Sequence, residues 1–219
     1  TTEIYTLSLH DALPIWFSDF SSYKPGTNLH EAKYWTGWHA IELDLWTKDS
    51  GYTNEFRAAL ADTLVSDTQS LYDLVYSNDF RVSLDEISNG AISLLEEVAT
   101  TKITGEEEAF SHTDLYDFQA NIEGAKVAYG DVRDLVKMKS PDTADAIDKA
   151  FQQMESELAK YNTGTAEKPV YPSYTEIDAN AGENQTDDKL SSGARSLSNQ
   201  INALRESVAQ LTSIVLKES

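Results

Sequence analysis

Apolar residues recur every three or four positions along most of the chain from about Leu29 onward, and no stretch alternates as a β-strand would. Because an α-helix turns once in about 3.6 residues, this spacing collects apolar side chains on one helical face. The sequence therefore predicts an all-α fold, an up-down bundle of about six helices with a long crossover before the last one. The expected helices cover residues 28–48, 54–76, 83–99, 113–139 and 140–161, and the last contains residues 194–215.

Helix-capping residues support several of these boundaries. Ser83-Leu84-Asp85-Glu86 is a capping box, in which a hydroxyl and a carboxylate each satisfy a free backbone N–H group. Pro141 directly follows the capping residue Ser140, and proline is common at the first position of a helix. Residues 162–190 contain prolines and Gly182, so we expect a crossover there that wraps over the bundle, with one helical turn after Ser173.

The first residues follow a different pattern. Residues 5–15, YTLSLHDALPI, resemble translated sequencing-adapter read-through, so we expect residues 1–16 to be a non-native leader and assign no function to His10. Residues 17–219 are then expected to form one helical bundle domain, with the crossover at about 162–190.

Charge and composition exclude several classes of function. A net charge of −20, from 37 acidic and 17 basic residues, repels phosphate backbones and attracts cations, so nucleic acid is not an expected partner. The chain has no cysteine, which excludes disulfides, zinc–thiolate sites, iron–sulfur clusters and cysteine nucleophiles. Any metal must therefore bind through oxygen and nitrogen atoms. No apolar run is long enough to predict a membrane span.

One acidic residue falls inside an apolar face of the first predicted helix, where an unpaired carboxylate is costly. Glu42 lies near the middle of this face and His39 lies one turn earlier, at its edge. The face itself is formed by Trp35, Trp38, Leu45 and Trp46. A carboxylate and an imidazole at this spacing can bind one cation. A salt bridge or a satisfied core histidine also explains such a pair, but the surrounding tryptophans favour a metal.

Two further helices carry an acidic residue on the predicted apolar face. Asp67 lies in the stripe of the second helix and Asp114 in that of the fourth, so one cation bound between three helices would explain all three carboxylates. A buried hydrogen bond is the alternative for Asp67, and a helix-dipole interaction for Asp114. His112 is either a ligand or a helix cap. Residues 106–108, all glutamate, are expected to be a solvated loop, although near a metal site they could recruit cations.

Three segments resemble the imelysin-like domain of the EfeO/EfeM iron-uptake proteins. They are GWHAIELDLW at 37–46, KITGEE at 102–107 and SHTDLYDFQANIEGA at 111–125. Proteins of that family are helical-bundle, extracytoplasmic components that bind iron beside a membrane iron permease and a haem peroxidase. The family's His-x-x-Glu motif falls on His39 and Glu42, and the acidic position of its following helix falls on Asp67.

The resemblance implies an extracytoplasmic, iron-binding component of a high-affinity ferrous/ferric uptake system, in the periplasm or as a cell-surface lipoprotein. It implies a binder rather than an enzyme, which captures Fe²⁺ or Fe³⁺ between helices and passes it to a membrane permease. Zinc and copper would also bind in vitro, since ligand type alone does not select among these metals. Membrane association is expected only through an N-terminal anchor missing from this sequence.

Two other functions remain open at the level of sequence. A metal-dependent peptidase would need a metal-bound water and a general base, for which Glu107 or His112 would be the candidate. A polysaccharide-binding protein, of the alginate-binding type, would expose aromatic side chains such as Tyr171 and Tyr174 in the crossover.

Overall fold

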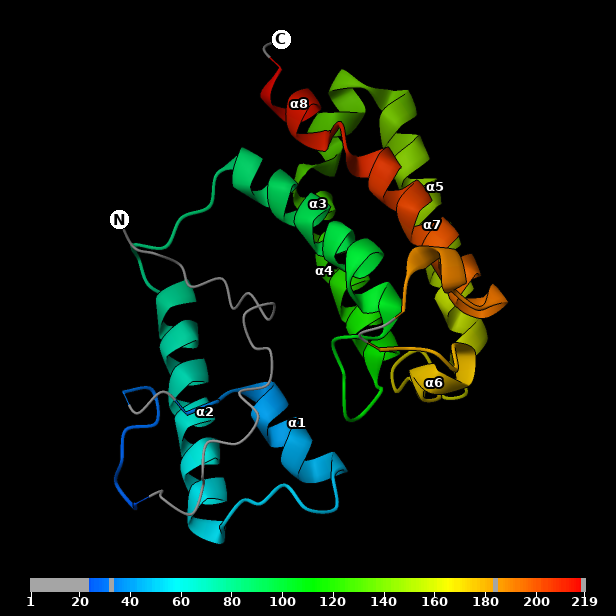
Figure 1. Ribbon diagram of the computed structural model, residues 1–219. Coiled ribbons are helices and arrows are strands. Elements are labelled where there is room, and N and C mark those ends of the chain that lie inside the picture. The colour runs from blue at the N-terminus through cyan, green and yellow to red at the C-terminus, as the bar shows by residue number, and fades with distance from the viewer. Residues whose placement is uncertain (1–23, 32–33, 183–184, 218–219) are drawn as a thin grey trace. The chain divides into compact units, whose positions relative to one another are not determined.

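The computed structural model describes residues 24–31, 34–182 and 185–217 (Figure 1). Every regular element in this part of the chain is helical, which confirms the predicted all-α class. The chain divides into two compact units, Thr1–Arg81 and Val82–Ser219, which we call unit 1 and unit 2. The predicted leader, residues 1–16, lies outside the described residues.

Unit 1 is a pair of helices, α1 (Trp38–Trp46) and α2 (Asn54–Val75). The side chain of Thr53 caps α2 by accepting a hydrogen bond from the backbone N–H of Phe56. The small core of the unit contains Leu29, Ala40, Tyr52, Phe56 and Leu60. This core holds α1 against α2 and so fixes the position of the first candidate ligands.

The first helix is much shorter than the predicted 28–48. Gly37 precedes α1 with φ 93°, a left-handed conformation that favours glycine and cannot continue a helix in the N-terminal direction. The predicted apolar face of this helix is also wrong, because Trp38, Leu45 and Trp46 are exposed. The residues of α1 that are buried are Ala40 and Glu42.

Unit 2 is an antiparallel helical bundle. Its long helices are α3 (Leu84–Thr100), α4 (Asp114–Lys139), α5 (Pro141–Leu158) and α7 (Ser192–Val208), followed by the short α8 (Leu211–Leu216). In Figure 1, α3 lies beside α4, and α5 lies beside α7, in agreement with the contacts between these helices. All predicted seam residues of α4 are buried, namely Leu115, Phe118, Ile122, Ala125, Tyr129, Val132 and Val136.

Sequence signals located most helix ends of unit 2. The predicted capping box is present, with the backbone N–H of Ser83 donating to Glu86 Oε2 at 2.7 Å, and Pro141 is the first residue of α5. The predicted last helix is interrupted at residues 209–210, between α7 and α8, although its apolar stripe from Ala194 to Val215 stays buried across the break. No glycine or proline marks this interruption.

The crossover folds over the end of the bundle where α3 ends and α4 begins. It begins after the 3₁₀ turn η4 (Ala159–Tyr161), which ends the α5 segment. It contains the 3₁₀ turn η5 (Asp187–Lys189) and the single turn α6 (Tyr174–Ile177), which follows Ser173 as predicted. The buried Tyr174 donates its backbone N–H to the His112 carbonyl at 2.9 Å and its hydroxyl to the Ile103 carbonyl at 2.8 Å. Tyr174 thus anchors the crossover to the loop that precedes α4.

No helix within the described ranges is both long and apolar enough to cross a membrane.

A glycine permits the close approach of the crossover to this loop. Gly105 has φ 74°, and a Cβ atom there would lie 2.7 Å from Ala181 Cβ and 2.9 Å from the Tyr174 ring.

We expect Gly105→Ala to lower the free energy of unfolding by about 1–3 kcal/mol, through backbone strain and overpacking. Gly90, in the interior of α3, has open space around it, and Gly90→Ala should stabilise by about 0.5–1 kcal/mol. Urea unfolding followed by circular dichroism measures both changes, and equal effects would contradict the packing described.

Candidate metal centre

His39 and Glu42 form a direct pair at the start of α1. His39 Nδ1 lies 2.9 Å from Glu42 Oε2, and the side chains are only 17% and 7% exposed. Both residues lie in the first five positions of the helix, one turn apart, so the helical backbone itself brings the imidazole and the carboxylate together. The pair is the arrangement that the sequence predicted.

The separation within this pair suits the coordination of one metal ion. Two ligand atoms that each bind a metal at about 2.1 Å, at nearly a right angle, are themselves about 3 Å apart. A metal ion would replace the proton that His39 and Glu42 share in their hydrogen bond. The pair thus offers one nitrogen and one oxygen ligand with little rearrangement of either side chain.

The structure does not bring Asp67 to this pair. Asp67 lies on an exposed part of α2, where its two carboxylate oxygens lie 3.1 and 3.2 Å from His30 Nε2. The predicted inward orientation is wrong, because the buried stretch of α2 ends at Leu60 while Leu71 and Leu74 are exposed. The partnership with His30 had no signal in the sequence, since the two residues are far apart along the chain and only the fold joins them.

The other predicted ligands, Asp114 and His112, belong to unit 2. Asp114 is the first residue of α4 and is fully buried, and neither of its carboxylate oxygens accepts a hydrogen bond of normal geometry. Its pKa rises to about 7, mainly because of burial and also because of the charges of Glu108 and Glu107, while the backbone N–H groups of Asp114 and Glu108 oppose part of the rise. A buried carboxylate with so little compensation is a candidate for either a proton or a metal ion.

His112 is held in a strained backbone conformation beside Asp114. Its φ is 54°, unusual for a residue with a side chain, and its Nδ1 is buried with no hydrogen-bond partner in the described part of the chain. Thr113, rather than His112, occupies the capping position of α4. The alternative role of His112 as a helix cap is therefore not supported by a hydrogen bond from its Nδ1 atom.

The run of glutamates at 106–108 is not the solvated loop that we expected. Glu107 forms an ion pair with Lys102, whose side chain is 4% exposed, and Glu108 accepts a hydrogen bond from Ser111 Oγ at 2.8 Å. Because both carboxylates have partners within the fold, they are held near the start of α4. A charge run is usually a solvated surface, which is why the sequence suggested otherwise.

Sequence reasoning missed two charged residues that interact with Glu107 and Glu108, namely Asp117 and Lys102. The pKa of Asp117 rises to about 7, mainly because of burial and also because of the charge of Glu108, while Lys102 opposes part of the rise. Asp117 follows Asp114 by three residues, so helical spacing could have placed the two carboxylates on one face. Lys102 is nearly buried, and nothing in its sequence context distinguishes it from a surface lysine.

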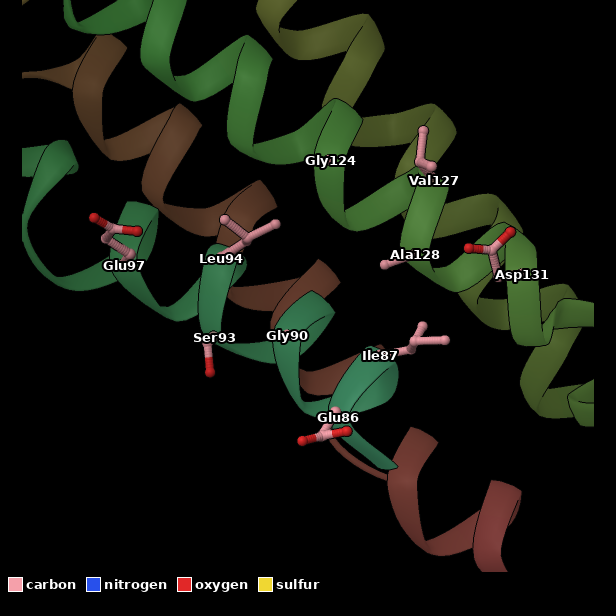
Figure 2. Close-up of a pocket in the computed structure, with 10 residues that line it drawn as sticks. All are labelled: Glu86, Ile87, Gly90, Ser93, Leu94, Glu97, Gly124, Val127, Ala128 and Asp131. Atoms are coloured by element: carbon pink, nitrogen blue, oxygen red, sulfur yellow. The ribbon is translucent and has the colours of Figure 1, made fainter. Parts of the chain in front are cut away.

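Within unit 2, a shallow groove of about 480 Å³ runs between α3 and α4. In Figure 2, Ile87 and Leu94 from α3 and Val127 and Ala128 from α4 lie along it, so its floor is largely apolar. Its charged residues, at the margins, are Glu86, Glu97 and Asp131. The lining contains no histidine, so it does not join a base and a metal-binding imidazole as a metallopeptidase cleft would.

Replacing Asp114 by asparagine removes a buried charge with little change of shape. In metal-free buffer containing a chelator at pH 8, we expect Asp114→Asn to raise the free energy of unfolding by about 1–3 kcal/mol. The folded pKa of about 7 lies above the ordinary 3.8. The folded state therefore holds the proton more tightly, and the contribution of Asp114 to stability is present below pH 4 and lost as the pH rises to 7. The free energy of unfolding of Asp114→Asn should therefore fall less between pH 4 and pH 7 than that of the parent protein.

Asp178 provides the matched control for this prediction. It is also buried, but its carboxylate accepts hydrogen bonds from Asn180 N at 3.0 Å, Gln185 Nε2 at 2.7 Å and Ser191 N at 2.9 Å. Asp178→Asn should therefore destabilise the protein at pH 8. Chemical unfolding at a series of pH values compares the variants, and equal destabilisation by both would show that Asp114 is compensated after all.

Comparisons with known proteins give the family of the chain. Its sequence matches the imelysin (peptidase M75) family over residues 11–211. It is 37% identical over 150 residues to the iron uptake system component EfeM of Pseudomonas syringae pv. syringae, covering 68% of this chain and 51% of that protein. It is 32% identical over 189 residues to EfeM of Bacillus subtilis, covering 86% and 44%.

A third relative carries the name of a lipoprotein. The chain is 38% identical over 147 residues to an Efem/EfeO family lipoprotein of Staphylococcus haemolyticus, which covers 67% of this chain and 50% of that protein. The chain spans about half the length of the curated relatives it matches. The family resemblance found in the sequence is confirmed, and the chain belongs to the imelysin family.

Proposed function

We propose that this protein is an extracytoplasmic iron-binding component of an iron uptake system, and that His39 and Glu42 are ligands of the iron. The observation that carries the proposal is the 2.9 Å contact between His39 Nδ1 and Glu42 Oε2, held with little exposure in one turn of helix. Family membership supports iron as the cargo, since two of the relatives are named iron uptake system components.

Ligand chemistry agrees with this cargo. Carboxylate oxygens and an imidazole nitrogen suit ferrous and ferric iron, and the same atoms bind zinc or copper in vitro. Unit 2, taken by itself, offers its own candidate metal ligands, which we propose are the buried carboxylate of Asp114 and the Nδ1 of His112, atoms without a hydrogen-bond partner among the described residues. Asp67, which is exposed and paired with His30, is left out of the proposed site.

The charge of the protein favours capture of cations from dilute solution. A net charge of −20 raises the local concentration of Fe²⁺ or Fe³⁺ and disfavours nucleic acid as a partner. We propose that the bound ion passes to a membrane iron permease that works with a haem peroxidase. The lipoprotein name of a relative supports a place outside the cytoplasm, in the periplasm or at the cell surface.

The peptidase name of the family keeps proteolysis as a second candidate. Glu107 would have been its general base, but this carboxylate is engaged by the ammonium group of Lys102. We therefore favour a binding protein over an enzyme. Cleavage of denatured casein that chelator abolishes, at micromolar protein concentration, would reverse this preference.

Polysaccharide binding has less support from the aromatic residues of the crossover. Tyr174 is fully buried and packs against Phe118, with ring centroids 5.6 Å apart. Tyr171 packs against Tyr116, with ring centroids 5.1 Å apart. Both tyrosines hold the crossover to the bundle instead of offering a surface for sugars.

The test of the proposed function is isothermal titration calorimetry with Fe²⁺ under anaerobic conditions. His39→Ala and Glu42→Ala should each weaken binding by at least about 100-fold, since loss of even an outer-shell partner of a metal ligand costs 10–100-fold. His30→Ala is the matched control, because His30 also contacts a carboxylate but is 55% exposed, and it should bind like the parent. Circular dichroism checks the folding of each variant. Parent-like affinity of both the His39 and Glu42 variants would contradict the assignment.

A further inference from the structure

We propose that Lys102 is a positioning residue that sets the cation-binding capacity of unit 2, because its ammonium group occupies Glu107, one of four carboxylates that influence one another electrostatically. These carboxylates are Glu107, Glu108, Asp114 and Asp117, which we call the unit 2 cluster. The inference deepens the proposed function, since it assumes that the carboxylates of this protein bind metal ions. The inference concerns the number of metal ions that the unit 2 cluster binds.

Lys102 lies in the 3₁₀ turn η3 (Lys102–Thr104), directly after α3. Only 3% of the residue is exposed, although lysine is almost never buried without a charged partner. Its Nζ atom forms an ion pair with Glu107 Oε2 and lies 3.8 Å from Glu97 Oε1. The ammonium is therefore held inside the protein by carboxylates, as a bound cation would be.

The cluster has more negative charge than Lys102 neutralises. Glu108 receives hydroxyl hydrogen bonds from Ser111 and Thr113, at 2.8 and 3.3 Å, which leave its charge in place. Asp114 is fully buried, neither of its oxygens accepts a hydrogen bond of normal geometry from the described residues, and it interacts electrostatically with Glu108 and Glu107. This unpartnered carboxylate is an independent sign that the cluster has capacity for a cation besides Lys102.

An ammonium and a divalent metal compete for the same oxygen atoms. While Lys102 pairs with Glu107, a metal has to compete with the ammonium group for Glu107 Oε2, and the positive charge repels any ion near Asp117. Without the ammonium, Glu107 and Asp117 become free carboxylates, and a hard divalent ion such as Mn²⁺ prefers oxygen ligands. Loss of Lys102 should thus create a place for one additional ion.

Binding of Mn²⁺, counted by equilibrium dialysis and electron paramagnetic resonance, tests this inference. The measurement uses a His39→Ala/Glu42→Ala background, so that the ligands proposed in unit 1 do not contribute. Lys102→Met should bind one Mn²⁺ more than this background protein. Lys102→Met/Glu107→Gln, in which the positive and negative charges are removed together, should bind the same number as the background. An unchanged number in Lys102→Met would overturn the inference.

A second comparison covers the case in which Lys102→Met does not fold. Glu107→Gln and Lys102→Met/Glu107→Gln differ only by the ammonium group, and both lack the carboxylate that would otherwise stay buried and unpaired. The double variant should bind Mn²⁺ at least tenfold more tightly than Glu107→Gln. Equal affinity would mean that Lys102 has a structural role alone. Failure of the proposed function would instead appear as unchanged Fe²⁺ binding in the His39 and Glu42 variants, so the two outcomes are distinguishable.

Discussion

Burying negative charge is the constraint on which the polar structure of this protein depends. A carboxylate taken out of water is costly unless hydrogen-bond donors, a cation or a proton compensates its charge. The described residues show several solutions. Asp178 accepts three N–H hydrogen bonds and fixes the crossover, while Glu42 contacts the imidazole of His39. Asp114 has neither a cation nor a hydrogen bond of normal geometry, and its pKa rises to about 7.

These different solutions separate structural carboxylates from candidate ligands. A carboxylate that accepts three hydrogen bonds within the fold, such as Asp178, could bind a metal only by losing some of them, at a cost to stability. The pair of His39 and Glu42 can exchange a shared proton for a metal ion, and Asp114 can gain a partner that it lacks. On this view, the metal-binding residues are those whose buried negative charge is not fully compensated by hydrogen bonds or cations of the protein itself.

Much of the fold could be predicted from local sequence signals. The capping box at Ser83, Pro141 at the start of α5 and the single turn after Ser173 are each decided by the residues themselves. The prediction was wrong where tertiary contacts decide. The first helix begins at Trp38 instead of residue 28, because Gly37 before it has a backbone conformation that apolar spacing does not reveal. The interruption before α8 has no signal in the sequence.

The candidate site was predictable to a similar extent. His39 and Glu42 meet because a helix places residues i and i+3 together, and that geometry is contained in the sequence. His30, the partner of Asp67, is distant in the chain, so helical spacing misplaced Asp67. Lys102, the partner of Glu107, is near in the chain but belongs to a separate 3₁₀ turn, so the glutamate run was described as a solvated loop. Pairs that the fold creates between separate elements require the structure.

The central claim, that iron binds at His39 and Glu42, is tested most directly by anomalous diffraction on both sides of the iron K edge. Crystals of the protein would be loaded anaerobically with Fe²⁺. We predict a peak above the edge, absent below it, within about 2.5 Å of a His39 ring nitrogen and a Glu42 carboxylate oxygen. Iron found only at other carboxylates, with no anomalous density beside this pair, would contradict the account.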